Sequence, residues 1–109
     1  MKPTDLRIGC YVKLRDSGEI VRVERLSRRK CGFFHGNDKS RSYFRKYSEI
    51  KPVKIFEVKS SLPYIPNFFW NDKAMREDLY YYKDLPITDL HELQNIHYAL
   101  TGNEIEIEL

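Results

Sequence analysis

Short runs of β-branched and aromatic residues recur about every ten residues through the first half of the chain, with turn-forming residues between them. In chain order they predict a hairpin at 6–26 that turns at 15–19, a strand at 32–35, a turn at 36–40, a strand at 41–47, and a strand or short 3₁₀ turn at 50–53. Gly18 supplies the positive φ that the first hairpin turn needs. Short strands at this interval are typical of a small β-barrel or a strongly bent sheet.

The second half is less regular until its last twenty or so residues. Residues 53–58 alternate as a strand does, whereas two prolines exclude a regular helix from 60–71. The aromatic side chains of that segment are expected to need burial: Tyr64, Phe68, Phe69 and Trp70. A turn or single helical turn at 72–75 and a strand around 79–82 are expected to follow.

The tail predicts the clearest element of the chain. Asp89 is a good N-cap residue and Glu92 lies three positions later, which is the spacing of a capping box. Gly102 supplies the left-handed C-cap, so we expect a helix over 89–101. Its apolar stripe comprises Leu90, Leu93, Ile96, His97 and Leu100. Residues 104–109 alternate Glu with Ile or Leu and predict a terminal strand with one buried and one acidic face.

Together these elements predict a single α+β domain. We expect an SH3-like antiparallel β-barrel over 1–58, an aromatic irregular segment over 59–88, and a helix plus terminal strand over 89–109. Apolar residues at 41% and aromatic residues at 14% provide a core without disulfides. Because no secretory signal and no membrane-spanning apolar run is present, we expect a cytoplasmic protein in which Cys10 and Cys31 are free thiols.

Charge divides the chain into two parts of opposite sign. Residues 1–60 contain 16 Lys and Arg against 7 Asp and Glu, a net charge of +9, whereas residues 61–109 contain 3 against 9, a net charge of −6. Such asymmetry favours a polyanionic partner, usually nucleic acid. The basic residues interleave with aromatic ones, and small barrels use this combination to place cations on phosphates and rings on bases. The predicted contact residues are Arg22, Arg25, Arg28, Arg29, Lys30, Lys39, Arg41, Arg45 and Lys46. The alternative is that the rings fill the core and the charges only solvate the surface.

Catalytic and metal-binding patterns are weak. Cys10, Cys31 and His35 are candidate ligands, but a structural zinc site needs four N or S ligands. Cys31 and His35 would lie about 13 Å apart on a strand, too far for a nucleophile–base pair. His91 and His97 lie on different faces of the predicted helix, and His97 is expected to be a hydrogen-bonded core residue. The remaining candidates are expected to form a solvated strand face: Glu104, Glu106 and Glu108. We therefore expect no enzyme, no metal and no cofactor.

Three segments of the chain resemble a group of small uncharacterised proteins from phages and mobile elements of gut-type anaerobic bacteria. Residues 5–23, DLRIGCYVKLRDSGEIVRV, are similar to the start of these proteins, where a leucine-arginine-isoleucine-glycine box precedes an SH3-like barrel. Residues 90–107, LHELQNIHYALTGNEIEI, are similar to their C-terminal LQN and ALTG helix, which a short strand follows. Residues 50–53, Ile-Lys-Pro-Val, resemble the I-x-P-I box between the two.

The middle of the chain departs from that group. VKIFEVKSSLPYIPNFFW, residues 53–70, stands where a Leu-rich helix is common, and His97 stands where an aromatic residue is usual. The resemblance therefore implies a fold and a mobile-element origin rather than a chemistry, and the middle segment is the place where a distinct partner would bind.

The expected function is non-enzymatic binding. We expect a phage-type accessory protein that engages a host nucleic-acid machine through its basic barrel, and inhibition of a defence complex such as a CRISPR effector fits this role by analogy. The alternative is a protein-only interaction module that uses the Pro and aromatic segment 62–70 as an apolar patch. Its contact residues would be Tyr64, Phe68, Phe69 and Trp70. Phosphate binding weakens steeply with salt, which distinguishes the two.

Overall fold

The computed structural model describes residues 1–35, 38–71 and 79–109. The chain divides into two compact units, unit 1 (Met1–Val53) and unit 2 (Lys54–Leu109). The structure is α+β, with three antiparallel sheets of three strands each and a helix near the C-terminus. The turn expected at 72–75 lies outside the described residues, as do positions 36 and 37 of the turn expected at 36–40. The rest of that turn is wrong, because a strand begins at Asp38.

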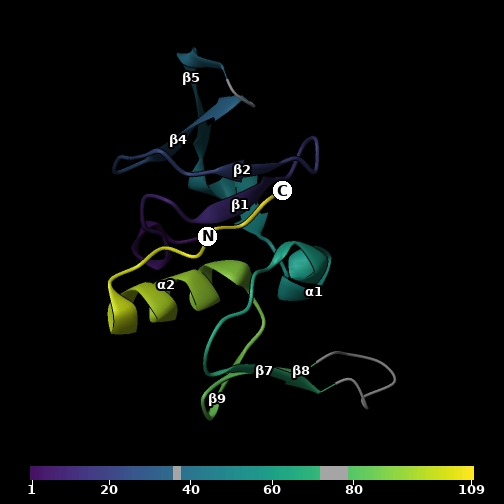
Figure 1. Cartoon of the computed structure of the whole chain (residues 1–109). Helices are drawn as coiled ribbons and strands as arrows, with labels where there is room; N and C mark the ends of the chain where they lie inside the picture. Colours follow the sequence, from purple (N-terminus) through teal and green to yellow (C-terminus); the bar gives the residue numbers. More distant parts are fainter. Residues whose placement is uncertain (36–37, 72–78) are drawn as a thin grey trace. The chain divides into compact units, whose positions relative to one another are not determined.

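Unit 1 consists of short strands and two 3₁₀ turns (Figure 1). In chain order they are η1 (Pro3–Asp5), β1 (Tyr11–Leu14), β2 (Ile20–Arg22), β3 (Arg25–Leu26), β4 (Lys30–His35), β5 (Asp38–Lys46), η2 (Tyr47–Glu49) and β6 (Ile50–Pro52). They form two sheets of order β2-β1-β6 and β3-β4-β5. The predicted first hairpin is confirmed, and Gly18 has a φ of 73° in its turn, a conformation that favours glycine.

The two sheets of unit 1 are joined by one bent stretch of backbone. Only Val23 and Glu24 separate β2 from β3, and both remain hydrogen bonded to neighbouring backbone. Val23 N donates to Cys10 O at 2.8 Å on one side, and Glu24 N donates to Gly32 O at 2.8 Å on the other. The strands therefore follow one another as β6-β1-β2/β3-β4-β5. Within the described residues no ladder pairs β5 with β6, so the structure gives no closed ring of paired strands.

The interior of unit 1 is one apolar cluster, to which alternate residues of the strands contribute. Its buried members are Leu6, Cys10, Val12, Leu14, Val21, Val23, Cys31, Phe33, Tyr47 and Ile50. Cys10 and Cys31 are free, as the sequence predicted. Burial raises the pKa of the Cys31 thiol, so this thiol is protonated and unreactive at neutral pH.

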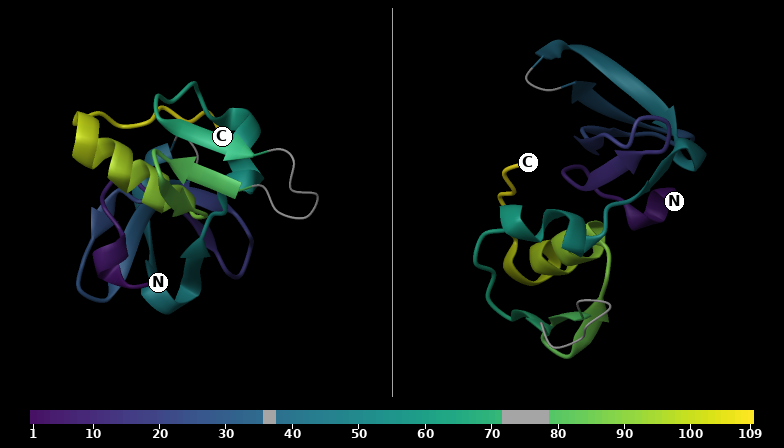
Figure 2. Two further views of the ribbon diagram at one scale, coloured as in Figure 1. Left: turned by 90° about the horizontal axis from the view of Figure 1, so that it is seen from below. Right: turned by 90° about the vertical axis from the view of Figure 1, so that its right-hand side faces the viewer.

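Unit 2 contains two helices and the third sheet. Its elements are α1 (Ile55–Val58), η3 (Lys59–Ser61), β7 (Phe68–Asn71), β8 (Leu79–Tyr82), β9 (Leu85–Ile87) and α2 (Leu90–Thr101), and the sheet order is β7-β8-β9. Figure 2 shows the two helices next to each other and the sheet on one side of them. The strand expected at 53–58 is wrong, because Ile55 and Val58 are buried with the spacing of one helical turn. Neither β7 nor β9 was predicted from the sequence, so the segment expected to be irregular contains a sheet of three strands.

The predicted C-terminal helix is confirmed as α2 together with its caps. Asp89 N donates to Glu92 Oε1 at 3.0 Å in the capping box. At the other end, Gly102 has a φ of 74° and its N–H donates to Tyr98 O at 2.8 Å. The helix therefore begins and ends where its local sequence dictates.

The predicted buried face of α2 is only half right. Leu90 and Leu93 are buried, but Leu100 is 56% exposed, and the buried positions of the first two turns also include His91 and Gln94. Burial thus follows the N-terminal half of the helix rather than a stripe along its whole length.

The terminal strand expected at 104–109 is wrong. Ile105 and Ile107 are buried and the three glutamates between and beside them are exposed, as the alternation predicted, but Leu109 is exposed. These residues nevertheless pair with no described strand, because alternation fixes which side chains are buried but supplies no neighbouring backbone to pair with.

Candidate nucleic-acid interface

The sheet β3-β4-β5 has two faces of different chemistry. Cys31 and Phe33 of β4 point into the core, and their cross-strand partners on β5 are Arg45 and Tyr43. Residues directly opposite one another in an antiparallel ladder share a face, and successive residues alternate. Lys30 and every second residue after it therefore belong to the outer face.

Three cross-strand rows make up this outer face. The rows are Lys30 with Lys46, then Arg25 with Gly32 and Phe44, then Phe34 with Ser42. All three cations are exposed, and the ring of Phe44 between them is 45% exposed. We call the cations and Phe44, together with Arg28 and Arg29 in the turn before β4, the basic face.

Gly32 sets the position of the Phe44 ring. A Cβ atom at position 32 would lie 2.8 Å from Cε1 of Phe44 and 3.1 Å from Cβ of Arg25. The missing side chain therefore lets the ring lie against the backbone of β4, as strand glycines often allow. The sequence analysis overlooked this residue, although a glycine inside a predicted strand signals a close approach.

The turn between β3 and β4 carries Arg28 and Arg29 at its tip. Ser27 N donates to Lys30 O at 2.9 Å, and the Ser27 hydroxyl donates to the same oxygen at 2.9 Å. Lys30 N donates back to Ser27 Oγ at 3.3 Å. This tight turn leaves both arginines exposed, at one end of the basic face.

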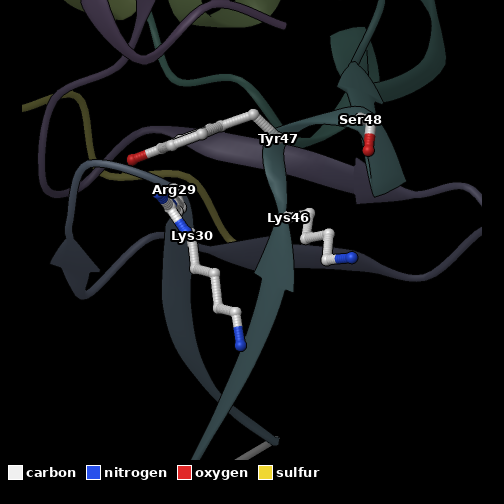
Figure 3. A pocket seen from close by; sticks show the side chains of 5 residues that line it. All are labelled: Arg29, Lys30, Lys46, Tyr47 and Ser48. Carbon is white, nitrogen blue, oxygen red and sulfur yellow. The ribbon is translucent and has the colours of Figure 1, made fainter.

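An open hollow of about 600 Å³ lies at this end of the sheet, and three of the five residues that line it are basic (Figure 3). It is lined by Arg29, Lys30, Lys46, Tyr47 and Ser48. The Tyr47 hydroxyl donates to Ser27 O, and desolvation raises the pKa of this phenol, so it remains neutral. Much of the surface of the hollow is aliphatic and aromatic, and the ammonium groups of Lys30 and Lys46 point away from Tyr47 in different directions (Figure 3). The hollow therefore brings positive charge to its rim rather than a ring of converging donors.

Lys30 and Lys46 face each other across the β4–β5 ladder, and like charges in this position destabilise a sheet. Neither ammonium makes an ion pair with a residue that the structure describes. The carboxylate of Glu49 accepts a hydrogen bond from Lys46 N at 2.8 Å, not from its side chain. The fold therefore places two lysines in one cross-strand row, and neither is paired with a described carboxylate.

Two of the predicted contact residues are instead partnered within unit 1. Arg22 Nε lies 3.7 Å from a carboxylate oxygen of Glu24. Arg45 lies on the other face of its sheet, with Nη2 3.7 Å from Asp16 Oδ2 and its guanidinium 5.8 Å from the ring centroid of Phe33. Their charges are therefore already partly compensated.

Lys39 and Arg41 lie towards the other end of β5 and are both exposed. They fall beyond the row of Phe34 and Ser42, so the structure does not bring them together with the hollow. Of the nine predicted cations, five lie on or beside the basic face: Arg25, Arg28, Arg29, Lys30 and Lys46.

The four aromatic residues proposed for protein contact do not behave alike. Phe68 is buried and stacks on Tyr80 with ring centroids 5.9 Å apart, so it belongs to the core of unit 2. Tyr64 is 90% exposed, and Phe69 and Trp70 are more than half exposed. The expectation that all four need burial is therefore wrong for three of them. Phe69 lies in one row with Tyr81 and Pro86 on the outer side of β7-β8-β9.

Metal-binding groups are dispersed over the part of the chain that the structure describes. No three His, Cys, Asp or Glu side chains gather there, and the His35 side chain is outside it. His91 is buried and His97 is half-buried, with its ring edge-on to Tyr82 at 6.3 Å. Nδ1 of both rings has no hydrogen-bond partner among the described residues, so the hydrogen bond expected for His97 is not seen at this atom.

Comparison with known proteins gives no relative from which a function can be transferred. No protein-family model, no curated protein and no solved structure matches the chain. None of the described helices combines the length and the apolar composition needed to cross a bilayer. Function must therefore be argued from the basic face and from the exposed rings of unit 2.

Proposed function

We propose that this chain is a non-enzymatic accessory protein that binds a nucleic acid or nucleoprotein of a bacterial host through the basic face. The observation that carries the proposal is the facing pair Lys30 and Lys46, with Arg29 beside it and no ion pair to a described carboxylate. A phosphate group between these cations would replace repulsion by charge-assisted hydrogen bonds. Such contacts supply most of the affinity of sequence-independent nucleic-acid binding.

The charge of each unit supports the same partner. Unit 1 contains 14 Lys and Arg against 6 Asp and Glu, a net charge of +8, and unit 2 contains 5 against 10, a net charge of −5. These add to the +3 of the whole chain. A polyanion is therefore attracted to unit 1 and repelled by unit 2, and its approach is steered to the basic face.

The strand order supports an SH3-like barrel as the fold of unit 1. The strands follow one another in the order β6-β1-β2/β3-β4-β5, and η2 lies immediately before β6. We propose that this order is that of an SH3-like barrel. Because fold alone does not specify function, the basic face remains the basis of the proposal. The resemblance to phage proteins adds the cytoplasm of the bacterial host as the place of action. Occupation of the RNA or DNA path of a CRISPR-type effector is one role that fits.

A second function, contact with a protein, is favoured by the exposed rings of unit 2. Tyr64, Phe69 and Trp70 are large, more than half exposed and carried by a unit of net negative charge. Tyrosine and tryptophan are enriched at the centres of protein interfaces, where they fill pockets on the partner. Phe68 takes no part in this proposal because it is buried.

The test of the main proposal is the anisotropy of a labelled mixed-sequence single strand, titrated with the full chain at several salt concentrations. In the variant Arg29→Glu with Lys30→Glu, affinity should fall at least about tenfold. The slope of log K against log salt should become shallower by about 1.4, since each lost phosphate contact contributes about 0.7 on a single strand. The control Lys2→Glu with Lys51→Glu changes the net charge equally at exposed positions of unit 1 outside the basic face.

The same assay separates the two functions. Phe69→Ser with Trp70→Ser should bind the oligonucleotide as the unchanged chain does, because neither ring belongs to the basic face. If both charge-reversal variants lose affinity equally, only the net charge matters and the site is wrong. If the unchanged chain shows no salt-dependent binding, the main proposal fails. Loss of a host protein from a pull-down with the Phe69 and Trp70 variant would then favour the second function.

A further inference from the structure

The exposed ring of Phe44 is a feature that phosphate binding alone does not require. It lies in the middle row of the basic face, which it shares with Arg25 and Gly32, and the row of Lys30 and Lys46 is next to it. An aromatic side chain at a solvent-facing position of a sheet loses the burial that usually stabilises it. Arg25 shares its row, and Lys30 and Lys46 form the next row on the same face, so an occupant that covers the ring also meets positive charge.

We infer that Phe44 stacks an unpaired nucleobase, so that the ligand of the basic face is single-stranded nucleic acid. This inference rests on the proposed function and adds the class of ligand. Bases in a duplex are paired and stacked inside the helix, whereas bases in a single strand offer their faces to aromatic side chains. A ring flanked by Lys and Arg is the combination with which proteins bind single strands.

The spacing of the basic face fits one nucleotide. Residues two apart on a strand lie about 6.6 Å apart along one face, and directly opposite residues have Cβ atoms about 5 Å apart. Lys46 is two residues from Phe44, and Arg25 shares the row of Phe44 across Gly32. A base that lies on the ring therefore leaves its sugar and phosphates within reach of these long cationic side chains.

Gly32 is the positioning residue for this stacking. The Phe44 ring lies where the Cβ of any other residue at position 32 would be, 2.8 Å from Cε1, so it rests on the backbone of β4 and exposes its remaining surface. Half-buried Phe34 in the next row extends the apolar strip from the ring along the same face. A side chain at position 32 would displace the ring without touching the cations' charged ends.

The test compares three probes of equal length: a single strand, its duplex, and an abasic deoxyribose-phosphate oligomer that carries phosphates without bases. The unchanged chain should bind the single strand most tightly. Phe44→Ala should weaken single-strand binding about 5- to 150-fold, the range for loss of one base–aromatic stack. Its affinity for the abasic oligomer and its salt slope should not change. Phe44→Tyr, which keeps a ring, should retain the preference for bases.

Gly32→Ala provides a second, independent variant. Its backbone is not in the left-handed region and the closest contact is the movable end of the ring, so the fold should be retained while single-strand binding weakens. Phe56→Ala removes an exposed ring from unit 2 and should change nothing. Single-stranded DNA and RNA probes, run in parallel, distinguish the two sources of unpaired bases.

Each outcome has one meaning. If the abasic oligomer or the duplex binds as tightly as the single strand, and Phe44→Ala has no effect, the stacking inference is wrong while phosphate binding stands. If none of the probes binds with salt dependence, the proposed function itself fails. Equal weakening of all three probes by Phe44→Ala would show that the ring only supports the sheet, which also overturns the inference.

Discussion

Both units place two charged residues directly across a backbone pairing, but with opposite outcomes. In unit 1 Lys30 faces Lys46 in the β4–β5 ladder. In unit 2 Lys54 faces Asp89 in an isolated antiparallel bridge, and Lys54 Nζ donates to Asp89 Oδ1 at 2.8 Å. Opposite charges across such a pairing stabilise it, whereas like charges destabilise it. The pair in unit 2 therefore serves the fold, and the pair in unit 1 exists despite its cost to the fold, as a ligand site would require.

The exposed aromatic rings of the two units also have different neighbours. Phe44 in unit 1 has Arg25 in its row and Lys30 and Lys46 in the row on one side of it, whereas Phe69 in unit 2 shares its row with Tyr81 and Pro86. The two rings are similarly exposed but suit different partners. Phe44 suits a polyanion with aromatic bases, and Phe69 suits an apolar protein surface.

The largest effect should come from the apolar core, which stabilises unit 2 more than its ion pair does. Leu93→Ala should lower the free energy of unfolding by about 2–5 kcal/mol, because the side chain is fully buried. The matched control on the same helix is Leu100→Ala, which should stay within about 0.5 kcal/mol because Leu100 is more than half exposed. Urea unfolding measures both. Equal losses would mean that the whole predicted stripe is buried and that the observed exposure of Leu100 is misleading.

This pair of residues also shows what the sequence could and could not predict. The caps at Asp89 and Gly102 are local, so the limits of α2 were predictable from neighbouring residues. Periodicity defines a face only as a broad arc, and the part of that arc that becomes covered depends on distant segments. Hence Leu93 was predicted correctly as core and Leu100 was not.

The same distinction between local and distant information applies to the basic face. Composition predicted the positive charge of the first half, and the turn at Arg28 and Arg29 follows from local sequence. The contact of Phe44 with Gly32 depends on the register of two strands, which a single sequence does not specify where both faces contain aromatic residues. For the same reason the sequence analysis could not tell Arg45, which faces Phe33, from the cations of the outer face.

An intermediate effect is expected from neutralising the facing lysines. Lys30→Gln with Lys46→Gln should raise the free energy of unfolding by about 0.2–1 kcal/mol at low salt, because cross-strand repulsion disappears. The same variant should bind the single-strand probe more weakly. The control Lys39→Gln with Arg41→Gln also removes two positive charges, both from β5. It should raise the free energy of unfolding by less than the variant at Lys30 and Lys46. A variant that loses stability would show that these lysines support the fold, and the contrast between the units would collapse.

The smallest effect should come from the ion pair of unit 2. The hydrogen bond that Lys54 Nζ donates to the Asp89 carboxylate raises the pKa of Lys54 above its usual 10.5. The stabilisation is therefore fully present below the pKa of Lys54 in the unfolded chain and disappears as pH rises through the higher folded value. Because Lys54 is half exposed, Lys54→Gln should cost no more than about 1 kcal/mol at neutral pH. The difference between the variant and the unchanged chain should therefore shrink as pH rises through the raised pKa of Lys54 in the folded chain.

Urea unfolding at neutral pH and at several alkaline pH values checks this difference directly. The control Lys83→Gln removes the same charge from an exposed position of unit 2 whose ammonium makes no ion pair with a described residue. If the cost of Lys54→Gln were the same at every pH, the contribution of Lys54 would come from its aliphatic chain rather than from its charge. Both units would then present cations without a stabilising carboxylate, and the facing lysines of unit 1 would no longer mark it as the binding unit.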